Sequence, residues 1–300
     1  MTVHDAHCHF FSMRFFEAMC RQRGDAAPDV TTTLGALDLE VPGPPEALAD
    51  RWAQELDHHR VGRAALIASV PGDEASVAAA VARHPDRFVG FFMVDPTAVD
   101  AETRVEAGLA SGRLRGVCLF PAMQRYPLHD ERVLRIAGIA AAHPGTVLFV
   151  HCGLLSVGIR ARLGVPGRFE MRFGNPLDLQ LLALTFPRLP IVVPHFGAGL
   201  FREALMIADA CPNVLFDTSS GNGWIRYHPG LTLEEVVRQA LHVVGPDRLV
   251  FGTDSSFFPR GWQRVVFERQ QVAFESLGLT AEEQQRILAG NFERLFPLPA

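Results

Sequence analysis

The 300-residue sequence predicts an α/β protein in which eight parallel strands, each followed by a helix, close into a (β/α)8 barrel of the TIM-barrel type. Two observations lead to this prediction. Short runs rich in β-branched and aromatic residues recur along the chain, nearly continuously apolar, as expected for strands covered on both faces. The stretches between them carry helix start signals. The runs span residues 3–10, 63–70, 88–94, 116–120, 146–152, 191–196, 214–219 and 249–255.

The helix start signals pair a capping side chain with apolar residues at helical spacing, with a proline at the first helical position, or with a glutamate three positions later. They occur at Asp73, Asp130, Asn175, Thr232 and Thr280. An open doubly wound sheet is the main alternative fold. That fold usually has a glycine-rich phosphate turn after its first strand, and this sequence has none.

Two connections are too long to be simple loops. Residues 11–45 follow the first predicted strand, and residues 153–174 follow the fifth. Because loops that follow strands lie on the catalytic face of a barrel, we expect both insertions to shape a substrate pocket. The second insertion contains four arginines, interpreted first as solvated charges and alternatively as anion-binding groups. No repeat or linker marks a second domain, so we expect residues 1–300 to form one domain.

Composition excludes several classes of function. A net charge of -5 without clusters of basic residues interleaved with aromatics argues against nucleic-acid binding. Five cysteines without a CxxC pair fit a reducing compartment better than a disulfide framework. No signal-peptide pattern and no apolar run of the roughly 20 residues that a membrane span needs is present. We therefore expect a cytoplasmic protein that acts on a small molecule, without nucleic-acid or membrane partners.

Polar side chains are rare in the predicted strands and gather at the carboxyl ends, which meet at one mouth of a barrel. Buried imidazoles and carboxylates need partners, and a shared cation satisfies several of them at once. It is the combination, rather than any single residue, that predicts a metal centre. The residues concerned are His7, His9, His151, His195, Asp217 and Asp254.

The spacing of His7 and His9 has a geometric basis. Side chains alternate along a strand, so Asp5, His7 and His9 are expected to point into the barrel and Cys8 toward the helices. Two imidazoles about 6 to 7 Å apart along a strand can reach one ion. Asp5, on the same face, is expected to support a ligand from behind, and Asp217 is a weaker candidate for the same role.

His151 from the fifth strand, Asp254 from the eighth and a water would complete the site. Nitrogen and oxygen ligands of this kind suit Zn(II), with Mn(II) or Fe(II) as alternatives. The sequence therefore predicts one divalent metal ion.

Five sequence motifs resemble those of the amidohydrolase superfamily, specifically the amidohydrolase-2 branch related to aminocarboxymuconate-semialdehyde decarboxylase. They cover essentially the whole chain and read DAHCHF, FVHCG, PHFGAG, FGTDSS and GNFERLF in that order. The resemblance implies that a metal is bound by four residues, namely His7, His9, His151 and Asp254. It also implies that His195 is a catalytic acid or base beside the metal, and that the protein forms a homodimer.

The sequence departs from this family in two respects. Some members carry a carboxylated lysine that bridges two metals at the end of the fourth strand, whereas here that strand reads GVCLFP and contains Cys118 but no lysine. A mononuclear site is therefore expected. The decarboxylase itself holds a substrate carboxylate with an arginine before its second strand, but residues 25–50 contain none. This argues against the decarboxylase's own substrate.

A metal ion lowers the pKa of its bound water from about 15.7 toward about 7. We therefore expect a metal-dependent hydrolase that cleaves an amide, lactone or ester bond in a small, carboxylate-bearing, cyclic or unsaturated substrate. His195 would stabilise or protonate the oxyanion, and Asp254 would move a proton from water to the leaving group. Non-oxidative decarboxylation with the same residues is the alternative, and a catalytically inactive metal-binding barrel is a remote one.

Aromatic and arginine residues follow the first, seventh and eighth predicted strands. The aromatic rings could form a slot for a flat substrate, and the arginines could meet its carboxylate. Alternatively, the rings pack the loops and the arginines pair with surface acids. The candidate substrate contacts are Phe10, Trp224, Arg226, Phe257 and Arg260.

Overall fold

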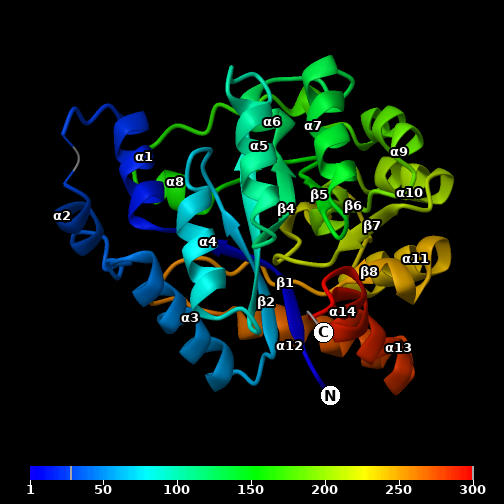
Figure 1. Cartoon of the computed structure of the whole chain (residues 1–300). Coiled ribbons are helices and arrows are strands. Elements are labelled where there is room, and N and C mark those ends of the chain that lie inside the picture. The colour runs from blue at the N-terminus through cyan, green and yellow to red at the C-terminus, as the bar shows by residue number, and fades with distance from the viewer. Residues whose placement is uncertain (28, 299–300) are drawn as a thin grey trace.

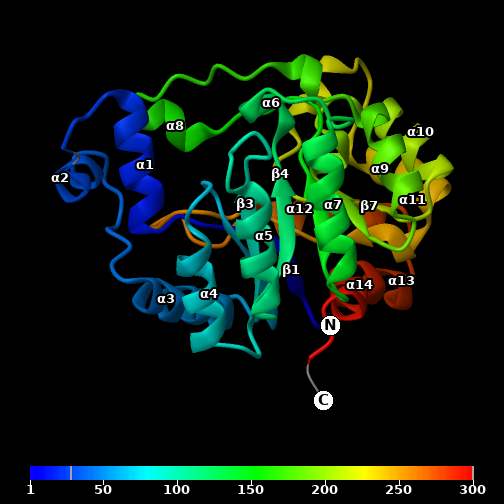
Figure 2. The same cartoon turned by 45° about the horizontal axis from the view of Figure 1, so that its top comes forward.

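The computed structural model describes residues 1–27 and 29–298 and confirms the predicted (β/α)8 barrel (Figures 1 and 2). Eight strands pair in sequence order, each parallel to the next. Every predicted run overlaps one strand, and only β4 begins before its run, by two residues. The strands are β1 (His4–Phe10), β2 (Arg63–Ala68), β3 (Phe88–Val94), β4 (Leu114–Leu119), β5 (Val147–Val150), β6 (Ile191–Val193), β7 (Val214–Asp217) and β8 (Leu249–Val250).

The last four strands are shorter than predicted because the polar residues at their carboxyl ends leave the ladder. β5 ends one residue before His151, and β6 ends two residues before His195. His195 and Asp254 adopt positive φ angles of 57° and 63°, which a strand does not allow. The backbone therefore turns at these points, and the polar side chains lie at the mouth of the barrel.

The barrel closes between β8 and β1 through the segment that follows β8. The backbone N–H of Asp254 donates to the carbonyl of His7 at 2.9 Å, and that of His9 donates to the carbonyl of Ser255 at 2.7 Å. These bonds fix Asp254 beside the two histidines of β1 through the main chain.

Helices form a layer around the strands (Figure 1). The predicted helix starts at Asp73, Asp130, Thr232 and Thr280 are confirmed, and Asn175 caps a 3-10 turn, Pro176–Leu179, that leads into α9. The helices outside the two insertions are α3 (Pro45–His58), α4 (Glu74–Arg83), α5 (Ala101–Ala110), α6 (Pro121–Gln124), α7 (Glu131–Ala142), α9 (Gln180–Thr185), α10 (Phe201–Ala210), α11 (Leu233–Val244), α12 (Arg264–Ser276), α13 (Ala281–Gln285) and α14 (Asn291–Leu295).

The two predicted insertions contain short helices that pack on each other. α1 (Met13–Arg23) and α2 (Val30–Gly35) follow β1, and α8 (Gly158–Arg162) follows β5. Figure 2 shows α8 beside α1. Buried side chains of both insertions share one apolar cluster, which includes Phe15 and Ile159. The insertions thus form one structure at the catalytic end of the barrel.

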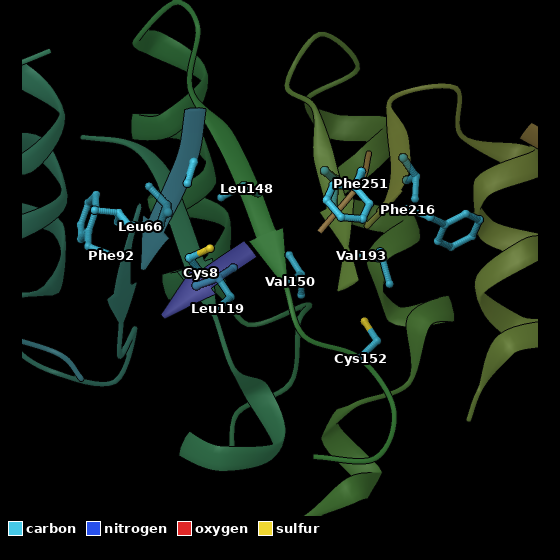
Figure 3. Close-up of a cluster of buried hydrophobic side chains, with 14 of the residues drawn as sticks. Cys8, Leu66, Phe92, Leu119, Leu148, Val150, Cys152, Val193, Phe216 and Phe251 are labelled. Carbon is cyan, nitrogen blue, oxygen red and sulfur yellow. The ribbon is translucent and has the colours of Figure 1, made fainter. Parts of the chain in front are cut away.

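Two apolar layers hold the barrel together. Outward-facing side chains of the strands, such as Leu66 and Phe92, pack against the helices (Figure 3). Inward-facing side chains, such as Ile67, Phe91 and Cys118, fill the barrel interior. Each fully buried side chain of this size contributes roughly 1.5 to 3 kcal/mol through the hydrophobic effect.

A β-bulge in β1 changes the predicted alternation. Asp5 pairs with Ala64 and Cys8 pairs with Leu66, so β1 carries one extra residue between these pairs. Cys8 faces the helices as predicted, but the bulge puts Asp5 on that same outer side. There Asp5 accepts a hydrogen bond from the indole N–H of Trp262. The expectation that Asp5 shares the inner face with His7 and His9 is therefore wrong.

Within the part of the chain that the structure describes, no helix has the length and apolar character that a membrane crossing requires.

Candidate metal centre

Three of the expected ligands converge at the mouth of the barrel. The Nε2 atoms of His7 and His9 lie 3.2 Å apart, and Oδ1 of Asp254 lies 3.6 Å from the first and 3.1 Å from the second. Two ligand atoms bound to one tetrahedral zinc, each about 2.0 to 2.1 Å from it, are about 3.3 Å apart. The spacing of these three atoms therefore fits a single ion.

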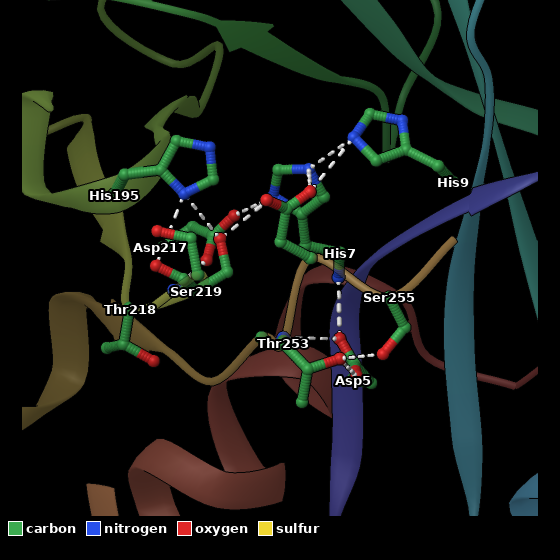
Figure 4. A network of polar contacts seen from close by, with 12 residues as sticks. Asp5, His7, His9, His195, Asp217, Thr218, Ser219, Thr253 and Ser255 are labelled. Carbon is green, nitrogen blue, oxygen red and sulfur yellow. Dashed lines mark hydrogen bonds and ion pairs between the residues drawn. The ribbon is translucent and has the colours of Figure 1, made fainter. Parts of the chain in front are cut away.

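The hydrogen bonds of the other ring nitrogens orient both imidazoles, and Figure 4 shows His7 beside Asp217. Nδ1 of His7 donates to the carboxylate of Asp217 at 2.6 Å. The Ser69 hydroxyl donates to the carbonyl of Ile67, so it accepts from Nδ1 of His9, at 2.7 Å. When both rings are neutral, their Nε2 atoms therefore present lone pairs toward the same carboxylate oxygen of Asp254. A cation at this point would remove the repulsion among the three groups.

His151 lies in the same cavity but outside this group of three, whose ligand atoms all lie within 4.8 Å of one another. Its ring stacks on Phe120 at a centroid distance of 5.5 Å and lies 5.3 Å from the ring of His195. Its Nδ1 atom is buried and has no hydrogen-bond partner among the described residues. A buried imidazole nitrogen without a partner is consistent with a ligand position for an ion.

His195 stacks on His7 at a centroid distance of 5.1 Å. Its Nδ1 lies 3.2 Å from the carbonyl oxygen of Ser219 and 2.9 Å from the hydroxyl of the same residue. The carbonyl can accept a proton from Nδ1, and the hydroxyl can donate to an unprotonated Nδ1. Ser219 therefore supports His195 in either protonation state, which suits a residue that gains and loses protons.

The backbone at His195 and Asp254 is strained. Both residues have positive φ angles although neither is glycine. Such conformations cost free energy and concentrate at functional sites, where the surrounding structure holds them in place.

Gly252 lies two residues before Asp254 and is needed for close packing. A Cβ at this position would lie 2.8 Å from Oδ1 of Asp217 and 3.0 Å from Cβ of His7. Only glycine lets this strand end approach the site so closely.

Two carboxylates support His7 in different ways. Asp217 bonds its ring, whereas Asp5 accepts a hydrogen bond from its backbone N–H at 2.9 Å. Asp5 also accepts from the backbone N–H and the hydroxyl of Thr253, at 3.1 and 2.5 Å, and from Trp262 at 2.7 Å. The sequence analysis favoured Asp5 over Asp217 as the carboxylate that supports a candidate metal ligand. In the structure it is Asp217, not Asp5, that bonds the ring of His7.

Burial and charge set the protonation of the histidines. Burial lowers the pKa of His9, His151 and His195, so their rings are neutral at pH 7 and can offer lone pairs. Burial also acts against a charge on His7, but the carboxylates of Asp217 and Asp254 outweigh it and raise the pKa of His7. His7 is therefore the imidazole for which a proton competes most strongly with a metal.

Asp254 and Asp5 differ in their ionisation. Burial opposes a charge on Asp254, but the close contact with His9 and the positive charge of a protonated His7 outweigh it, so the pKa of Asp254 falls below its ordinary value. Asp254 is thus ionised at neutral pH, as a ligand or a proton acceptor must be. Burial raises the pKa of Asp5 to about 6, although hydrogen bonds, the first of them from Thr253, partly offset the effect.

A cavity of about 650 Å³ opens above the centre. The clustered histidines and Asp254 line its inner end, and both insertions contribute to its walls. Of the candidate substrate contacts, Phe257 and Arg260 line the cavity, and their role in substrate binding stays a prediction. Arginines of the second insertion also line it, namely Arg160, Arg162 and Arg168.

The structure places three other candidate contacts elsewhere. Phe10 is fully buried among the outer apolar side chains because it follows His9 in the alternation of β1, and Phe11 lines the cavity instead. Trp224 is also buried in the outer layer, where its ring packs against Phe201. Arg226 is exposed and bonds the hydroxyl of its neighbour Tyr227. None of the three lines the cavity.

A second metal bridged by a carboxylated lysine has no counterpart here. Cys118 lies in the barrel interior, where burial raises the pKa of its thiol and keeps it protonated. The entire sequence contains no lysine, since all 28 of its basic residues are arginine.

Ser69 and Ser219 are site residues that the sequence alone did not single out. Ser219 belongs to a polar stretch after β7, and Ser69 follows β2. Both hydroxyls lie one or two residues beyond a strand, at the end of the barrel where the histidines gather. That position is the one signal that could have indicated them.

Comparisons with known proteins agree with the barrel fold. Protein fluG from Emericella nidulans is 27% identical over 143 residues, which are 46% of this chain and 15% of that protein. The 5-carboxyvanillate decarboxylase LigW from Sphingomonas paucimobilis matches with a TM-score of 0.67 at 17% identity, over 99% of both chains. An amidohydrolase from Burkholderia multivorans with bound zinc matches with a TM-score of 0.66 at 18% identity, over 100% of both chains. At this identity the structural matches establish the fold.

The amidohydrolase family model matches residues 4–298, nearly the whole chain. This match covers all five of the motifs that suggested the resemblance. The chain belongs to the amidohydrolase family, in its amidohydrolase-2 branch.

Proposed function

We propose that the protein is a metal-dependent hydrolase that uses one divalent ion, most suitably Zn(II), to cleave an amide, lactone or ester bond in a carboxylate-bearing substrate. The observation that carries this proposal is the convergence of two imidazole lone pairs and one ionised carboxylate on a single point. The donor set of nitrogen and oxygen suits zinc, and Mn(II) or Fe(II) are the alternatives. The zinc-bound relative from Burkholderia multivorans is consistent with this choice.

We assign the ion to His7, His9 and Asp254, with His151 as the fourth protein ligand. When bound, the ion supplies a water of lowered pKa and polarises the carbonyl to be cleaved. Asp217 and Ser69 hold the two rings of β1 so that their Nε2 lone pairs face inward.

Asp254 and His195 move the protons in this proposal. Asp254, ionised because of the neighbouring histidines, takes a proton from the attacking water and passes it to the leaving group. His195, held at Nδ1 by Ser219, acts at its other nitrogen as the acid or base beside the developing oxyanion. Water thus adds across the bond, and the products are an acid and an amine or alcohol.

Phe257 and Arg260 are the proposed substrate contacts nearest to Asp254. Arg260 donates to the Asp254 carbonyl at 3.2 Å and to the Ser256 hydroxyl at 2.6 Å, and its guanidinium lies 4.8 Å from the centre of the Phe257 ring. Arg162 lies over the same ring at 5.4 Å. The hydrogen bonds of both guanidinium groups go to uncharged oxygens, namely two backbone carbonyls and the Ser256 hydroxyl. Two such groups on one ring favour an anionic substrate.

Decarboxylation at the same residues is the second candidate. It is favoured by the position of Arg260 beside Asp254, which could hold a carboxylate at the centre, and by the fold shared with the 5-carboxyvanillate decarboxylase. A third candidate, a barrel that binds metal without catalysis, predicts metal content without turnover. A small-molecule substrate, a homodimer and a cytoplasmic location also stay proposals.

An activity screen of the metal-loaded protein tests these candidates. We expect acid release from a lactone, an ester or an N-acyl compound, lost after chelation and restored by added zinc. Asp254→Asn is expected to lower turnover by at least about a hundredfold. Release of carbon dioxide instead of acid would favour decarboxylation. Turnover that survives chelation or the Asp254→Asn substitution would contradict both reactions.

A further inference from the structure

The cavity extends well beyond the metal centre along a row of side chains. The ring of His9 lies 5.5 Å from that of Phe11, which in turn stacks on Phe15 at 3.8 Å with nearly parallel planes. The wall continues along α1 through Met19 and Gln22, which also line the cavity. Positions 15, 19 and 22 share one face of a helix, so the row leads in one direction, away from the centre.

The second insertion provides a facing apolar wall. Its lining side chains come from α8 and from the residues on either side of it, and include Leu155, Val157, Ile159 and Phe169. The middle of the cavity is therefore apolar on two sides.

Arg160 marks the far end of this passage. Its Nη1 donates to Oε1 of Gln22 at 2.8 Å, its Nη2 donates to the carbonyl of Pro166 at 3.0 Å, and its guanidinium lies 5.5 Å from the centre of the Phe169 ring. All of these partners are uncharged. Nε of Arg160 is buried and has no hydrogen-bond partner among the described residues. The guanidinium is thus held in place, and its buried Nε–H is unpaired.

No carboxylate compensates this charge within the cavity. Asp95 and Asp254 are the acidic residues among those that line it. Asp254 belongs to the metal centre, and Asp95 follows β3 and accepts hydrogen bonds from Thr97. Arg168 of the second insertion also lines the cavity and adds to the positive charge. An anion beside Arg160 would offset a charge that the protein leaves uncompensated.

We infer that the substrate is an elongated acid: its scissile bond lies at the metal centre, an apolar chain or ring lies along α1, and a carboxylate at its far end binds Arg160. This inference rests on the proposed hydrolase function and names its substrate class. The helical segment from Phe15 to Gln22 alone is about 10 Å long. A spacer of at least about this length separates the two ends, longer than the single ring of the 5-carboxyvanillate named for the Sphingomonas relative.

Titration calorimetry of the zinc-loaded protein tests this inference without requiring turnover. The probes are butanedioic, octanedioic, decanedioic and dodecanedioic acid, in which one carboxylate represents the hydrolysis product at the metal centre. Each is compared with the monocarboxylic acid of the same chain length. We expect the second carboxylate to increase affinity about tenfold in the long acids and not in butanedioic acid.

Three variants assign this gain to its residue. Arg160→Gln is expected to remove the tenfold gain, and Arg160→Lys, which keeps the charge, to retain part of it. Arg172→Gln is the matched control, because Arg172 belongs to the same insertion, pairs with Glu170 and does not line the cavity. A gain that is equal at all chain lengths, or that persists in Arg160→Gln, would overturn the inference.

The outcomes separate this inference from the proposed function. If metal-dependent hydrolysis is found but long acids gain nothing from Arg160, the inference fails and the hydrolase proposal remains. If long acids depend on Arg160 but no hydrolysis is found, the binding geometry holds and the hydrolase proposal fails.

Discussion

Nδ1 of His7 lies 2.6 Å from Oδ2 of Asp217, and the two side chains are 1% and 0% exposed. Because the carboxylate can only accept, the proton lies on Nδ1 and the lone pair of Nε2 faces the centre. The pair thus determines which nitrogen of His7 is available to a metal. The proposed ligand His7 on β1 is thus oriented by a residue at the end of β7, more than two hundred positions later in the chain.

Asp217→Asn is expected to weaken metal binding about 10- to 100-fold without unfolding the barrel. The amide lacks the charge that favours Nδ1–H and can present its NH₂ group to the ring instead. Chelator competition measures the affinity. Asp209→Asn, an exposed change on α10, is the control and should leave the affinity unchanged. Equal affinities in the two variants would show that Asp217 does not orient His7.

His195→Asn is expected to keep the metal and to lower turnover by about 10²- to 10⁴-fold, because it removes the acid or base beside the centre. Metal content and activity are measured on the same sample. His143→Asn, at a surface histidine that bonds Glu106, serves as the control. Loss of the metal in His195→Asn would show that His195 is a ligand instead.

Metal affinity is expected to fall with decreasing pH. In the metal-free protein the Asp217 and Asp254 carboxylates raise the pKa of His7, so below that pKa the ion must displace a proton. The logarithm of the affinity then falls by about one unit per pH unit, and it levels off above the pKa. Calorimetry in buffers with different ionisation enthalpies counts the released proton. An affinity independent of pH between about 5 and 7 would contradict this assignment.

Asp5→Asn is expected to lower the free energy of unfolding by about 3 kcal/mol. Asp5 accepts four hydrogen bonds with its two oxygens. An amide has only one oxygen, so its NH₂ group must face two donors. Denaturant unfolding measures the change, and Asp38→Asn, at an exposed position with φ of 52° that asparagine tolerates, is the control. A difference below about 1 kcal/mol between the variants would contradict the role assigned to Asp5.

The fold could be predicted because strands covered on both faces leave a visible signal, a run of apolar residues. The sequence placed the ends of the strands less accurately than the strands themselves. The run 249–255 contains a strand of only two residues, Leu249–Val250, because the following residues turn to bring Asp254 to the mouth. A composition pattern does not distinguish a strand from an extended segment that leaves the ladder.

The clustered histidines and Asp254 could be predicted because these residue types are rare at the ends of apolar strands. The preference for Asp5 over Asp217 as the support of a histidine ring was wrong, because no glycine or proline marks the bulge that turns Asp5 outward. Ser69 and Ser219 were missed because single hydroxyls in loops carry no periodic signal. The positions of Trp224 and Arg226 depend on how a long loop packs, which alternation along a strand does not determine.

The metal content of the purified protein tests the central claim most directly. Wild-type protein and a His7→Asn/His9→Asn double variant are loaded with zinc, dialysed and measured by inductively coupled plasma mass spectrometry. We expect about one zinc per chain in the wild type and almost none in the double variant, with circular dichroism showing that both are folded. A wild-type chain that retains no metal, or a double variant that retains as much as the wild type, would contradict the assignment of these histidines to a metal centre.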